Sequence, residues 1–361
     1  MSLTPLKGFT PAASTPRLIA GPCAAETREQ VLEAARALAG TPGLMWFRTG
    51  VWKPRTRSAS FEGAGEPALA WLAEVRELGL EPCLEVALPR HVEQALAAGI
   101  DCFWIGTRTV GSPFAVQELA DALAGCGEVS LLVKNPLSPD LGLWLGALER
   151  LERAGLTRLG GMHRGFLMHS QEGQPRGERY RFSPRWRLVL ALRRLLPDLP
   201  IFADPSHLAG HRELVGEVAQ MALDLGLDGL MLEVHPRPDE ALCDAEQQLD
   251  PPGLGRLLGE LILRRPESPA PAFGSELEKL RAAIDEADAA ILEAVARRLG
   301  IVEEIARLKQ GERVTPFQRA RMIEVLESWR EAGTRLGLDD RLTTELYELL
   351  HEAALEVHWK R

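Results

Sequence analysis

The sequence lacks features that would each indicate a particular class of protein. No apolar run approaches the roughly 20 residues that a membrane-spanning helix needs. The formal net charge is −9, so the positive excess typical of nucleic-acid and membrane-surface binders is missing. The five cysteines, an odd number scattered over 361 residues, do not suggest a disulfide framework. We therefore expect no nucleic-acid partner and no membrane partner.

The start of the sequence also lacks a targeting signal. Residues 1–16 have neither the charged start nor the apolar core of a secretory signal peptide. Together with the few cysteines, this predicts a reducing, cytoplasmic location. The composition, 45% hydrophobic and 26% charged, is that of an ordinary globular protein. The length suits one large domain and one small domain.

Short apolar runs alternate with longer helical patterns over most of the chain. The candidate strands are Leu18–Ala20, Leu44–Arg48, Pro82–Val86, Cys102–Ile105, Val129–Lys134, Leu156–Gly160, Ile201–Ala203 and Gly229–Glu233. The helical patterns include Thr27–Ala39, Pro67–Leu78, His91–Ala98, Pro113–Leu123, Leu141–Ala154, Pro184–Leu196, Leu208–Leu225 and Gly253–Leu263. Such alternation implies a parallel sheet with helices outside it. Eight units in roughly 250 residues predict a closed (β/α)8 TIM barrel, with an open doubly wound sheet as the alternative.

The composition changes after the last of these units. Residues 264–275 contain three prolines and are typical of a linker. From Glu276 the pattern is purely helical, with candidate helices at Glu276–Lys309, Gln318–Ala332 and Asp339–His358. We predict a barrel domain at 1–263, a linker at 264–275 and an all-α domain at 276–361. A helix as long as the first one rarely stands alone, so we expect a helical dimer or a higher homo-oligomer.

Chemistry in a (β/α)8 barrel is located where strands end and the following loops begin. Six cations occupy such positions: Arg48, Lys53, Arg55, Arg108, Lys134 and Arg164. Six like charges in one pocket would repel each other unless anions fill it, and guanidinium groups match carboxylates and phosphates in shape. The pattern predicts a pocket for several anionic groups, such as two phosphates and a carboxylate. For any single cation, the alternative is a solvated surface position.

A second set at the strand ends mixes ligand types. It consists of Cys23, His207, Glu233 and Asp244. One thiol, one imidazole and two carboxylates indicate a divalent-metal site, such as one for Mn, Co, Fe or Zn, and not a structural zinc site of four cysteines. The alternatives are a packing role for the cysteine and local hydrogen bonds for the histidine. Placement on strands one, seven and eight, which are neighbours in a closed barrel, favours ligands.

The remaining cysteines and two histidines near the strand ends receive other interpretations. Cys83, Cys102, Cys126 and Cys243 lack metal-ligating neighbours in this scheme, so we expect them to be packing residues. His163 and His235 are expected to lie beside the metal ligands without joining them.

These residues stand in motifs that resemble a known family. The motifs are GPCAAET, RTGVWKPRT, WIGTRT, LVKNP, GMHRGF, FADPSH, LMLEVHP and LCDAEQQL. Over nearly all of residues 17–260 they resemble the type I 3-deoxy-D-arabino-heptulosonate 7-phosphate (DAHP) synthases, in the short form without an N-terminal regulatory domain. The resemblance implies a (β/α)8 barrel with one divalent metal ion. It departs at Thr107, where that family commonly has Ala.

The resemblance also implies roles for the barrel residues. Cys23, His207, Glu233 and Asp244 would hold the metal. Phosphoenolpyruvate would be held by Arg48, Lys53, Arg108, Lys134 and Arg164. Erythrose 4-phosphate would meet Arg55 and Thr56. Lys53 and Lys134 are the candidate catalytic residues, and Lys134 is a candidate proton donor.

A related family offers an alternative reaction. The synthases of 3-deoxy-octulosonate 8-phosphate condense phosphoenolpyruvate with arabinose 5-phosphate. They typically read Lys-Ala-Asn-Arg-Ser where this chain reads Lys53-Pro54-Arg55-Thr56. A rigid proline and an extra guanidinium shorten the pocket, which favours the four-carbon sugar phosphate.

The first helix of the C-terminal segment places cations on its apolar seam. Arg298 shares a seven-residue spacing with Ile284, Ile291 and Ile305. Arg281 and Lys309 lie on the adjacent heptad position. A cation on such a seam is costly unless it is paired, so the pattern predicts a dianion bound between helices. The alternative is a frayed seam whose long side chains reach water.

Residues 276–361 resemble the all-helical chorismate mutases. Leu280-Arg281, Arg297-Arg298, Leu308-Lys309 and Arg321 keep that family's cations at matching spacing. The resemblance implies a domain-swapped dimer that rearranges chorismate to prephenate, with Arg281 supplied by the opposite subunit. Arg281, Arg298, Lys309 and Arg321 would bind the substrate, and Arg298, Lys309 and His358 would act in catalysis.

Four positions depart from that second family. Gln318 and Met322 stand where the family often has Asp and Glu, Ala354 replaces a common Ser, and His358 replaces Gln or Glu. The alternative is therefore a non-catalytic sensor of prephenate or chorismate that regulates the barrel.

Overall fold

The computed structural model describes residues 3–10, 15–53, 61–167, 179–265, 267–268 and 270–360. The chain divides into two compact units, residues 1–264 and 265–361. Within the described residues, no helix combines the length and the apolar character that crossing a membrane requires.

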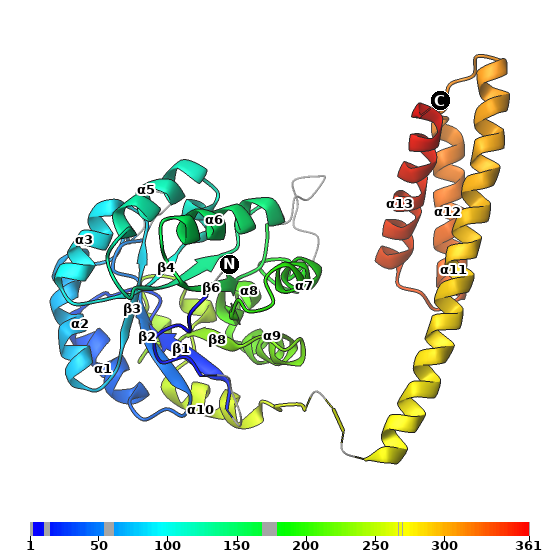
Figure 1. The fold of residues 1–361 in the computed structure, drawn as a ribbon. Coiled ribbons are helices and arrows are strands. Elements are labelled where there is room, and N and C mark those ends of the chain that lie inside the picture. Colours follow the sequence, from blue (N-terminus) through cyan, green and yellow to red (C-terminus); the bar gives the residue numbers. More distant parts are fainter. Residues whose placement is uncertain are drawn as a thin grey trace. The chain divides into compact units, whose positions relative to one another are not determined.

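The first unit is a closed barrel of eight parallel strands that follow each other in sequence order (Figure 1). The strands are β1 (Arg17–Gly21), β2 (Leu44–Thr49), β3 (Pro82–Val86), β4 (Cys102–Ile105), β5 (Ser130–Lys134), β6 (Arg158–His163), β7 (Ile201–Ala203) and β8 (Gly229–Glu233). β1 pairs with β8, in a register that sets Gly21 against Glu233, and this pairing closes the ring. The predicted barrel is confirmed, and the open-sheet alternative is wrong.

Helices surround the barrel. They are α1 (Arg28–Leu38), α2 (Pro67–Glu77), α3 (Pro89–Ala97), α4 (Thr107–Val110), α5 (Pro113–Leu123), α6 (Leu141–Arg153), α7 (Trp186–Leu195), α8 (Pro205–Ala209), α9 (Arg212–Asp224) and α10 (Pro251–Glu260), with short 3-10 turns η1 (Pro238–Glu240) and η2 (Ala245–Gln247). The sequence predicted one helix over Leu208–Leu225, which is wrong. Gly210 adopts a left-handed conformation (φ 78°) that ends α8, and α9 begins two residues later.

The strand ends opposite the candidate site are closed by the N-terminal segment. Leu6 packs inside the barrel with Ile19, Trp46 and other buried side chains. The Lys7 ammonium pairs with Asp101, which precedes β4, at 2.9 Å. The Trp46 indole donates a hydrogen bond to the Lys7 carbonyl oxygen at 3.1 Å. Because this end is filled, the open end is the one where the strands finish.

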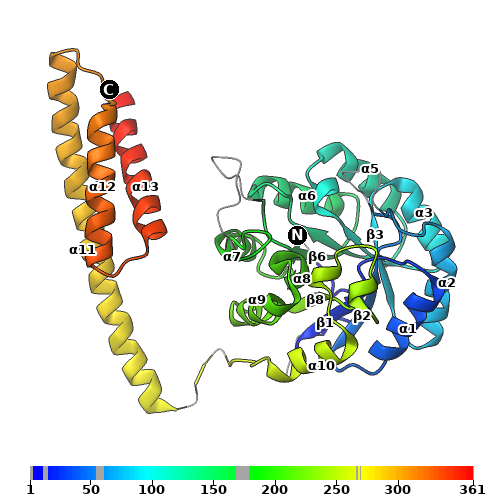
Figure 2. The same ribbon diagram turned by 180° about the vertical axis from the view of Figure 1, so that it is seen from behind.

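The second unit contains the three expected helices, α11 (Pro271–Gly311), α12 (Arg319–Arg335) and α13 (Asp340–Trp359). The sequence extended the linker to Ser275, but α11 begins at Pro271. A proline is tolerated there because the first helical turn has no hydrogen bond for its missing N–H to lose. The first half of α11 extends past α12 and α13 in both views (Figures 1 and 2).

Candidate functional site

The four predicted metal ligands lie together at the carboxyl ends of the strands. Cys23 follows β1, His207 lies in α8 after β7, Glu233 ends β8, and Asp244 precedes η2. In one group, ligand atoms of His207, Glu233 and Asp244 lie within 4.8 Å of one another. In a second group, Cys23 and Asp244 do the same together with Cys243. Asp244 belongs to both groups and joins them, although no single group among the described residues contains both Cys23 and His207.

The orientation of His207 is set by a residue that the sequence analysis missed. Asp204 caps α8 by accepting a hydrogen bond from the His207 backbone N–H at 3.2 Å. Its carboxylate also lies 3.0 Å from His207 Nδ1. This leaves His207 Nε2 facing Glu233 Oε1 at 3.6 Å, the arrangement in which an imidazole binds metal through one nitrogen and is held through the other. An Asp followed by Pro at a helix start is the signal that could have identified it.

The two carboxylates of the cluster are ionised, which suits a divalent cation. Burial acts to raise the pKa of Glu233, but His207 and Arg48 outweigh it and hold that pKa below its ordinary value. The pKa of Asp244 also lies below its ordinary value, because the effects of His207 and Arg181 outweigh that of burial. Burial lowers the pKa of His207, and the attraction of Asp204 and Glu233 opposes this effect. Glu233 Oε1 is buried and accepts no hydrogen bond of good geometry from the described residues, although Arg48 Nη2 lies 3.1 Å away.

Two of the predicted cations are buried at the centre of the site. Arg48 Nη2 lies 3.1 Å from Glu233 Oε1, and Lys134 Nζ lies 2.7 Å from Asp204 Oδ2. Both cations lie over the ring of Trp104, at 5.1 Å and 5.6 Å from its centroid. The Nε and Nη1 atoms of Arg48 are buried without a partner in the described part of the chain. Unsatisfied buried guanidinium donors fit an anionic ligand.

Lys53 contacts the candidate metal ligand Cys23. Its Nζ lies 2.7 Å from the carbonyl oxygen and 2.7 Å from Sγ of that residue. Burial lowers the pKa of Lys53, but the electrostatic effect of Cys23 and Cys243 outweighs it and raises the pKa above its usual value. The Lys53 ammonium therefore lies against the two thiols. The neighbouring Arg55 and Thr56 lie outside the described residues.

Arg164 and Arg108 bring further positive charge to the same end. Burial lowers the pKa of Arg164 to about 10, and repulsion by Arg181 and Arg108 adds to the effect. The Arg164 guanidinium lies 4.0 Å from the centroid of the Phe182 ring. Arg108 is exposed on α4. Neighbouring cations that lower the pKa of a buried guanidinium such as that of Arg164 are expected where an anion binds. Arg181, another residue that the sequence analysis missed, pairs with Asp244 at 3.0 Å.

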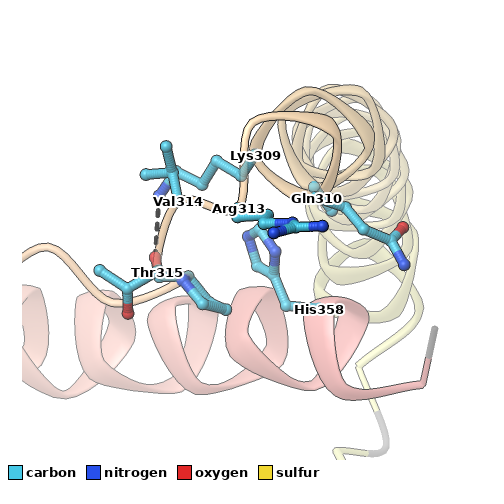
Figure 3. A pocket seen from close by; sticks show the side chains of 8 residues that line it. Lys309, Gln310, Arg313, Val314, Thr315 and His358 are labelled. Carbon is cyan, nitrogen blue, oxygen red and sulfur yellow. Dashed lines mark hydrogen bonds between the residues drawn. The ribbon is translucent and has the colours of Figure 1, made fainter.

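In the helical unit, a cavity of about 440 Å³ brings Lys309 and His358 together (Figure 3). Arg313 and Pro316 also line it, and Lys309 Nζ donates to the Pro316 carbonyl oxygen at 2.8 Å. Burial and the Lys309 charge lower the pKa of His358. His358 is therefore a neutral imidazole at pH 7.

The other predicted cations of this unit lie elsewhere. Arg298 donates to the Leu350 carbonyl oxygen at 2.8 Å, and Arg321 pairs with Glu324 at 2.7 Å. Arg281 pairs with Glu278 on the same helix. It is 28 residues before Lys309 in α11, which is about 42 Å along a helix axis. A single copy therefore does not bring Arg281 to the cavity.

Comparison with known proteins agrees with this geometry. Residues 12–261 match the family model described as the DAHP synthetase I family. The chain belongs to the DAHP synthetase I family. Residues 280–358 match the model of chorismate mutase type II. The fused architecture that the motifs predicted is thus confirmed.

Individual relatives match the barrel. A phospho-2-dehydro-3-deoxyheptonate aldolase of Thermotoga maritima is 31% identical over 238 residues, 64% of this chain and 65% of the relative, so the match spans less than two thirds of that protein. A 2-dehydro-3-deoxyphosphooctonate aldolase of Nitratidesulfovibrio vulgaris is 27% identical over 68% of this chain and 90% of its own length. The crystal structure of the Thermotoga maritima DAHP synthase superposes with a TM-score of 0.59 at 28% identity, covering 68% of each chain.

Proposed function

We propose that the barrel condenses phosphoenolpyruvate with erythrose 4-phosphate and water to give DAHP and phosphate, and that the helical unit rearranges chorismate to prephenate. Family membership over residues 12–261 supports the first activity. The observation that carries it is the pair of donor groups joined at Asp244, one containing Cys23 and the other His207 and Glu233, beside buried cations at the carboxyl ends of the strands.

The residues of the barrel divide the work between orientation and proton transfer. The carboxylate and phosphate of phosphoenolpyruvate are bound by the unpaired donors of Arg48 together with Arg164 and Lys134. These cations keep phosphoenolpyruvate close to erythrose 4-phosphate despite the repulsion between the two anions. Lys134 is also the candidate proton donor, because Asp204 fixes the position of its buried ammonium. Cys23, His207, Glu233 and Asp244 would hold a divalent metal ion, which supplies a Lewis acid for the sugar aldehyde.

The choice of sugar phosphate rests on the family match and on the motif at Lys53-Pro54-Arg55-Thr56. Relatives described as 2-dehydro-3-deoxyphosphooctonate aldolases also match, at 27% identity over 90% of one such protein. The test is to compare kcat/KM for erythrose 4-phosphate and arabinose 5-phosphate. We expect a preference for the four-carbon sugar, and a preference for the pentose would assign the barrel to the octulosonate reaction.

The mutase activity is supported by the match over residues 280–358 and by the cavity shared by Lys309 and His358. A non-catalytic sensor is the second candidate, because Gln318, Met322 and Ala354 depart from the family pattern. We expect the full chain to form prephenate and Lys309→Ala to stop it. Absence of prephenate formation by the wild type, combined with inhibition of the synthase by added prephenate, would instead establish the sensor.

We also propose that the helical unit pairs with a second copy. The apolar side chains of Ile284, Ile291, Leu292 and Leu308 on α11 are more than half exposed in the single chain. A partner would cover them and bring its Arg281 within reach of the Lys309 cavity. Sedimentation equilibrium of the full chain tests the dimer.

The five cysteines, all free in the structure, favour a reducing compartment such as the cytoplasm.

A further inference from the structure

Cys243 does not occupy the simple packing position that the sequence analysis gave it. Its sulfur, the Cys23 sulfur and an oxygen of Asp244 all lie within 4.8 Å of one another. Only two apolar residues among those described pack with the two thiols in this cluster, Ala24 and the partly buried Phe61. In contrast, Cys83 and Cys102 lie in the apolar interior of the barrel among large hydrophobic side chains. Cys243 therefore has the surroundings of a ligand group and not those of a core residue.

The fold holds the two cysteines side by side through a buried amide. The Gln248 side chain accepts a hydrogen bond from the Cys23 backbone N–H at 3.0 Å and donates one to the Cys243 carbonyl oxygen at 2.9 Å. Gln248 is fully buried. A second tie comes from Glu26, whose carboxylate accepts a hydrogen bond from the Leu242 N–H at 2.9 Å. Both loops are fixed by these bonds, so the closeness of the thiols is a built feature of the site.

The charges around the cluster are those that a site with two thiolates needs. Two thiolates and the carboxylates of Glu233 and Asp244 would bring four negative charges. The positive charges in contact are those of a divalent ion, the Lys53 ammonium 2.7 Å from Cys23 Sγ, the Arg48 guanidinium 3.1 Å from Glu233 and the Arg181 guanidinium 3.0 Å from Asp244. A buried cluster in which every negative charge is matched avoids the cost of uncompensated charge.

We propose that Cys243 is a second thiolate ligand of the barrel metal ion, and that it shifts the site toward thiophilic divalent ions such as Zn²⁺ and Cd²⁺ and away from Mn²⁺. The inference rests on the metal site proposed above. Each thiol that binds loses its proton to solvent, and soft sulfur donors select soft metals over those that prefer oxygen. The other donors, His207 and the two carboxylates, are unchanged by this addition.

The test uses Co²⁺ as a spectroscopic probe on the reduced full chain under nitrogen. Bound thiolates give Co²⁺ a near-ultraviolet charge-transfer band whose intensity per ion increases with the number of sulfur ligands. We expect Cys243→Ser to lose about half of this intensity. Cys126→Ser is the matched control, because Cys126 lies after α5 and its thiol contacts the Ala122 carbonyl oxygen. Equal bands in wild type and Cys243→Ser would overturn the proposal.

The reciprocal variant keeps the proposal testable if Cys243→Ser fails to fold. Cys23→Ser should retain about half of the band, because Cys243 still binds. Complete loss of the band in a Cys23→Ser protein that still holds Co²⁺, as measured by metal analysis, would leave the metal site in place and remove Cys243 from it. A wild type without any band would overturn the metal site and this inference together. Competition between Cd²⁺ and Mn²⁺ gives a second readout, and Cys243→Ser should reduce the preference for Cd²⁺ by roughly tenfold or more.

Discussion

Asp204 links the anion pocket to the metal cluster through one buried side chain. Its carboxylate lies 2.7 Å from the Lys134 ammonium and 3.0 Å from His207 Nδ1, and it is fully buried. Although burial opposes ionisation, His207 and Lys134 outweigh it and hold the pKa of Asp204 well below its ordinary value. Asp204 is therefore ionised at neutral pH and fixes both partners.

Replacing this carboxylate should weaken both functions of the barrel. We expect Asp204→Asn to lower metal affinity and synthase kcat/KM by roughly 10- to 100-fold, because His207 loses its orienting acceptor. Leaving Lys134 buried without its counter-ion should cost about 3 kcal/mol of unfolding free energy. Steady-state kinetics and urea unfolding measure the two effects.

A matched substitution separates this role from helix capping. Asp250 caps α10 by accepting a hydrogen bond from the Gly253 N–H at 2.7 Å, and an Asn at that position also caps. Asp250→Asn should therefore leave both quantities near their wild-type values. Wild-type kinetics in Asp204→Asn would contradict the proposed link between Lys134 and His207.

His91 should make the barrel sensitive to acid. Its ring stacks on Trp52 with centroids 4.2 Å apart, and its Nδ1 accepts a hydrogen bond from the Ala87 N–H. Burial, with repulsion by Arg90, lowers its pKa from 6.5 to about 4. The folded state thus binds fewer protons than the unfolded state, so the stabilisation is present above pH 6.5 and is lost as pH falls toward 4.

The size of this effect can be measured against a variant that cannot titrate. Between pH 7 and pH 5 we expect the unfolding free energy to fall by roughly 1 to 2 kcal/mol through this residue, allowing for solvent screening. His91→Phe keeps the ring stack and removes the proton, so its pH dependence should be smaller by that amount. Equal pH dependence in urea unfolding would exclude His91 as the source.

His358 should shape the pH profile of the mutase. Charge builds on the ether oxygen of chorismate as the bond breaks, and an imidazolium donates to it more strongly than a neutral imidazole. Since burial and Lys309 lower the pKa of His358, we expect kcat to rise only below pH 6.5 and to stay level from pH 7 to 8. His358→Gln should remain active with a flat profile. Identical profiles for the two proteins would remove His358 from the reaction.

The sequence predicted the candidate site residues that lie at the ends of strands, but it did not predict contacts between residues of different loops. Cys23, His207 and Glu233 lie at or just after strand ends, so the barrel topology brings them together. The closeness of Cys243 to Cys23 was not predicted, because it depends on a loop contact. Gln248 holds that contact through its hydrogen bond to Cys23, which lies 225 residues earlier in the sequence. The contact of Trp104 with Arg48 and Lys134 was not predicted, because an aromatic side chain in a buried strand cannot be distinguished, from the sequence, from an ordinary core residue.

At the scale of elements, α12 and α13 meet at a glycine. A Cβ added to Gly333 would lie 2.4 Å from Thr343 Oγ1, whereas a Cβ on Gly300 of α11 would meet nothing within 4 Å. We expect Gly333→Ala to destabilise the helical unit, by roughly 1 to 3 kcal/mol. Gly300→Ala should stabilise it by about 0.5 to 1 kcal/mol, because alanine is the better helix former.

Thermal unfolding followed by circular dichroism at 222 nm compares the two glycine variants in the full chain. Opposite shifts of the helical transition would support the packing of α12 on α13. Destabilisation of equal size in both variants would contradict it.

Element boundaries were predicted best where burial alone determines them. The strands are buried on both faces, so their apolar runs stand out, and β3, β4, β7 and β8 agree with the sequence analysis to the residue. The helix after β7 was mistaken for a single one because the hydrophobic pattern continues through Gly210. The left-handed backbone of Gly210 and the extended backbone of His211 separate α8 from α9, and Asp204 caps the other end of the short helix that holds His207.

At the scale of the whole molecule, the proposed function places two kinds of chemistry in one chain. The proposed synthase reaction needs charged ligands around a metal, whereas the proposed rearrangement of chorismate needs only donors and cations that fit a dianion. The metal-ligand candidates at the carboxyl ends of the strands belong to residues 1–264, and the Lys309 cavity belongs to residues 265–361. The two activities should therefore respond differently to loss of metal.

The most direct measurement is to assay both reactions on one preparation before and after chelation, and again after a first-row divalent ion is restored. We predict that chelation abolishes formation of DAHP, that the added ion restores it, and that formation of prephenate is unchanged throughout. Cys23→Ala and His207→Ala should abolish DAHP formation even with the ion present, with prephenate formation retained. Full synthase activity after complete removal of metal, or loss of both activities together, would contradict the account.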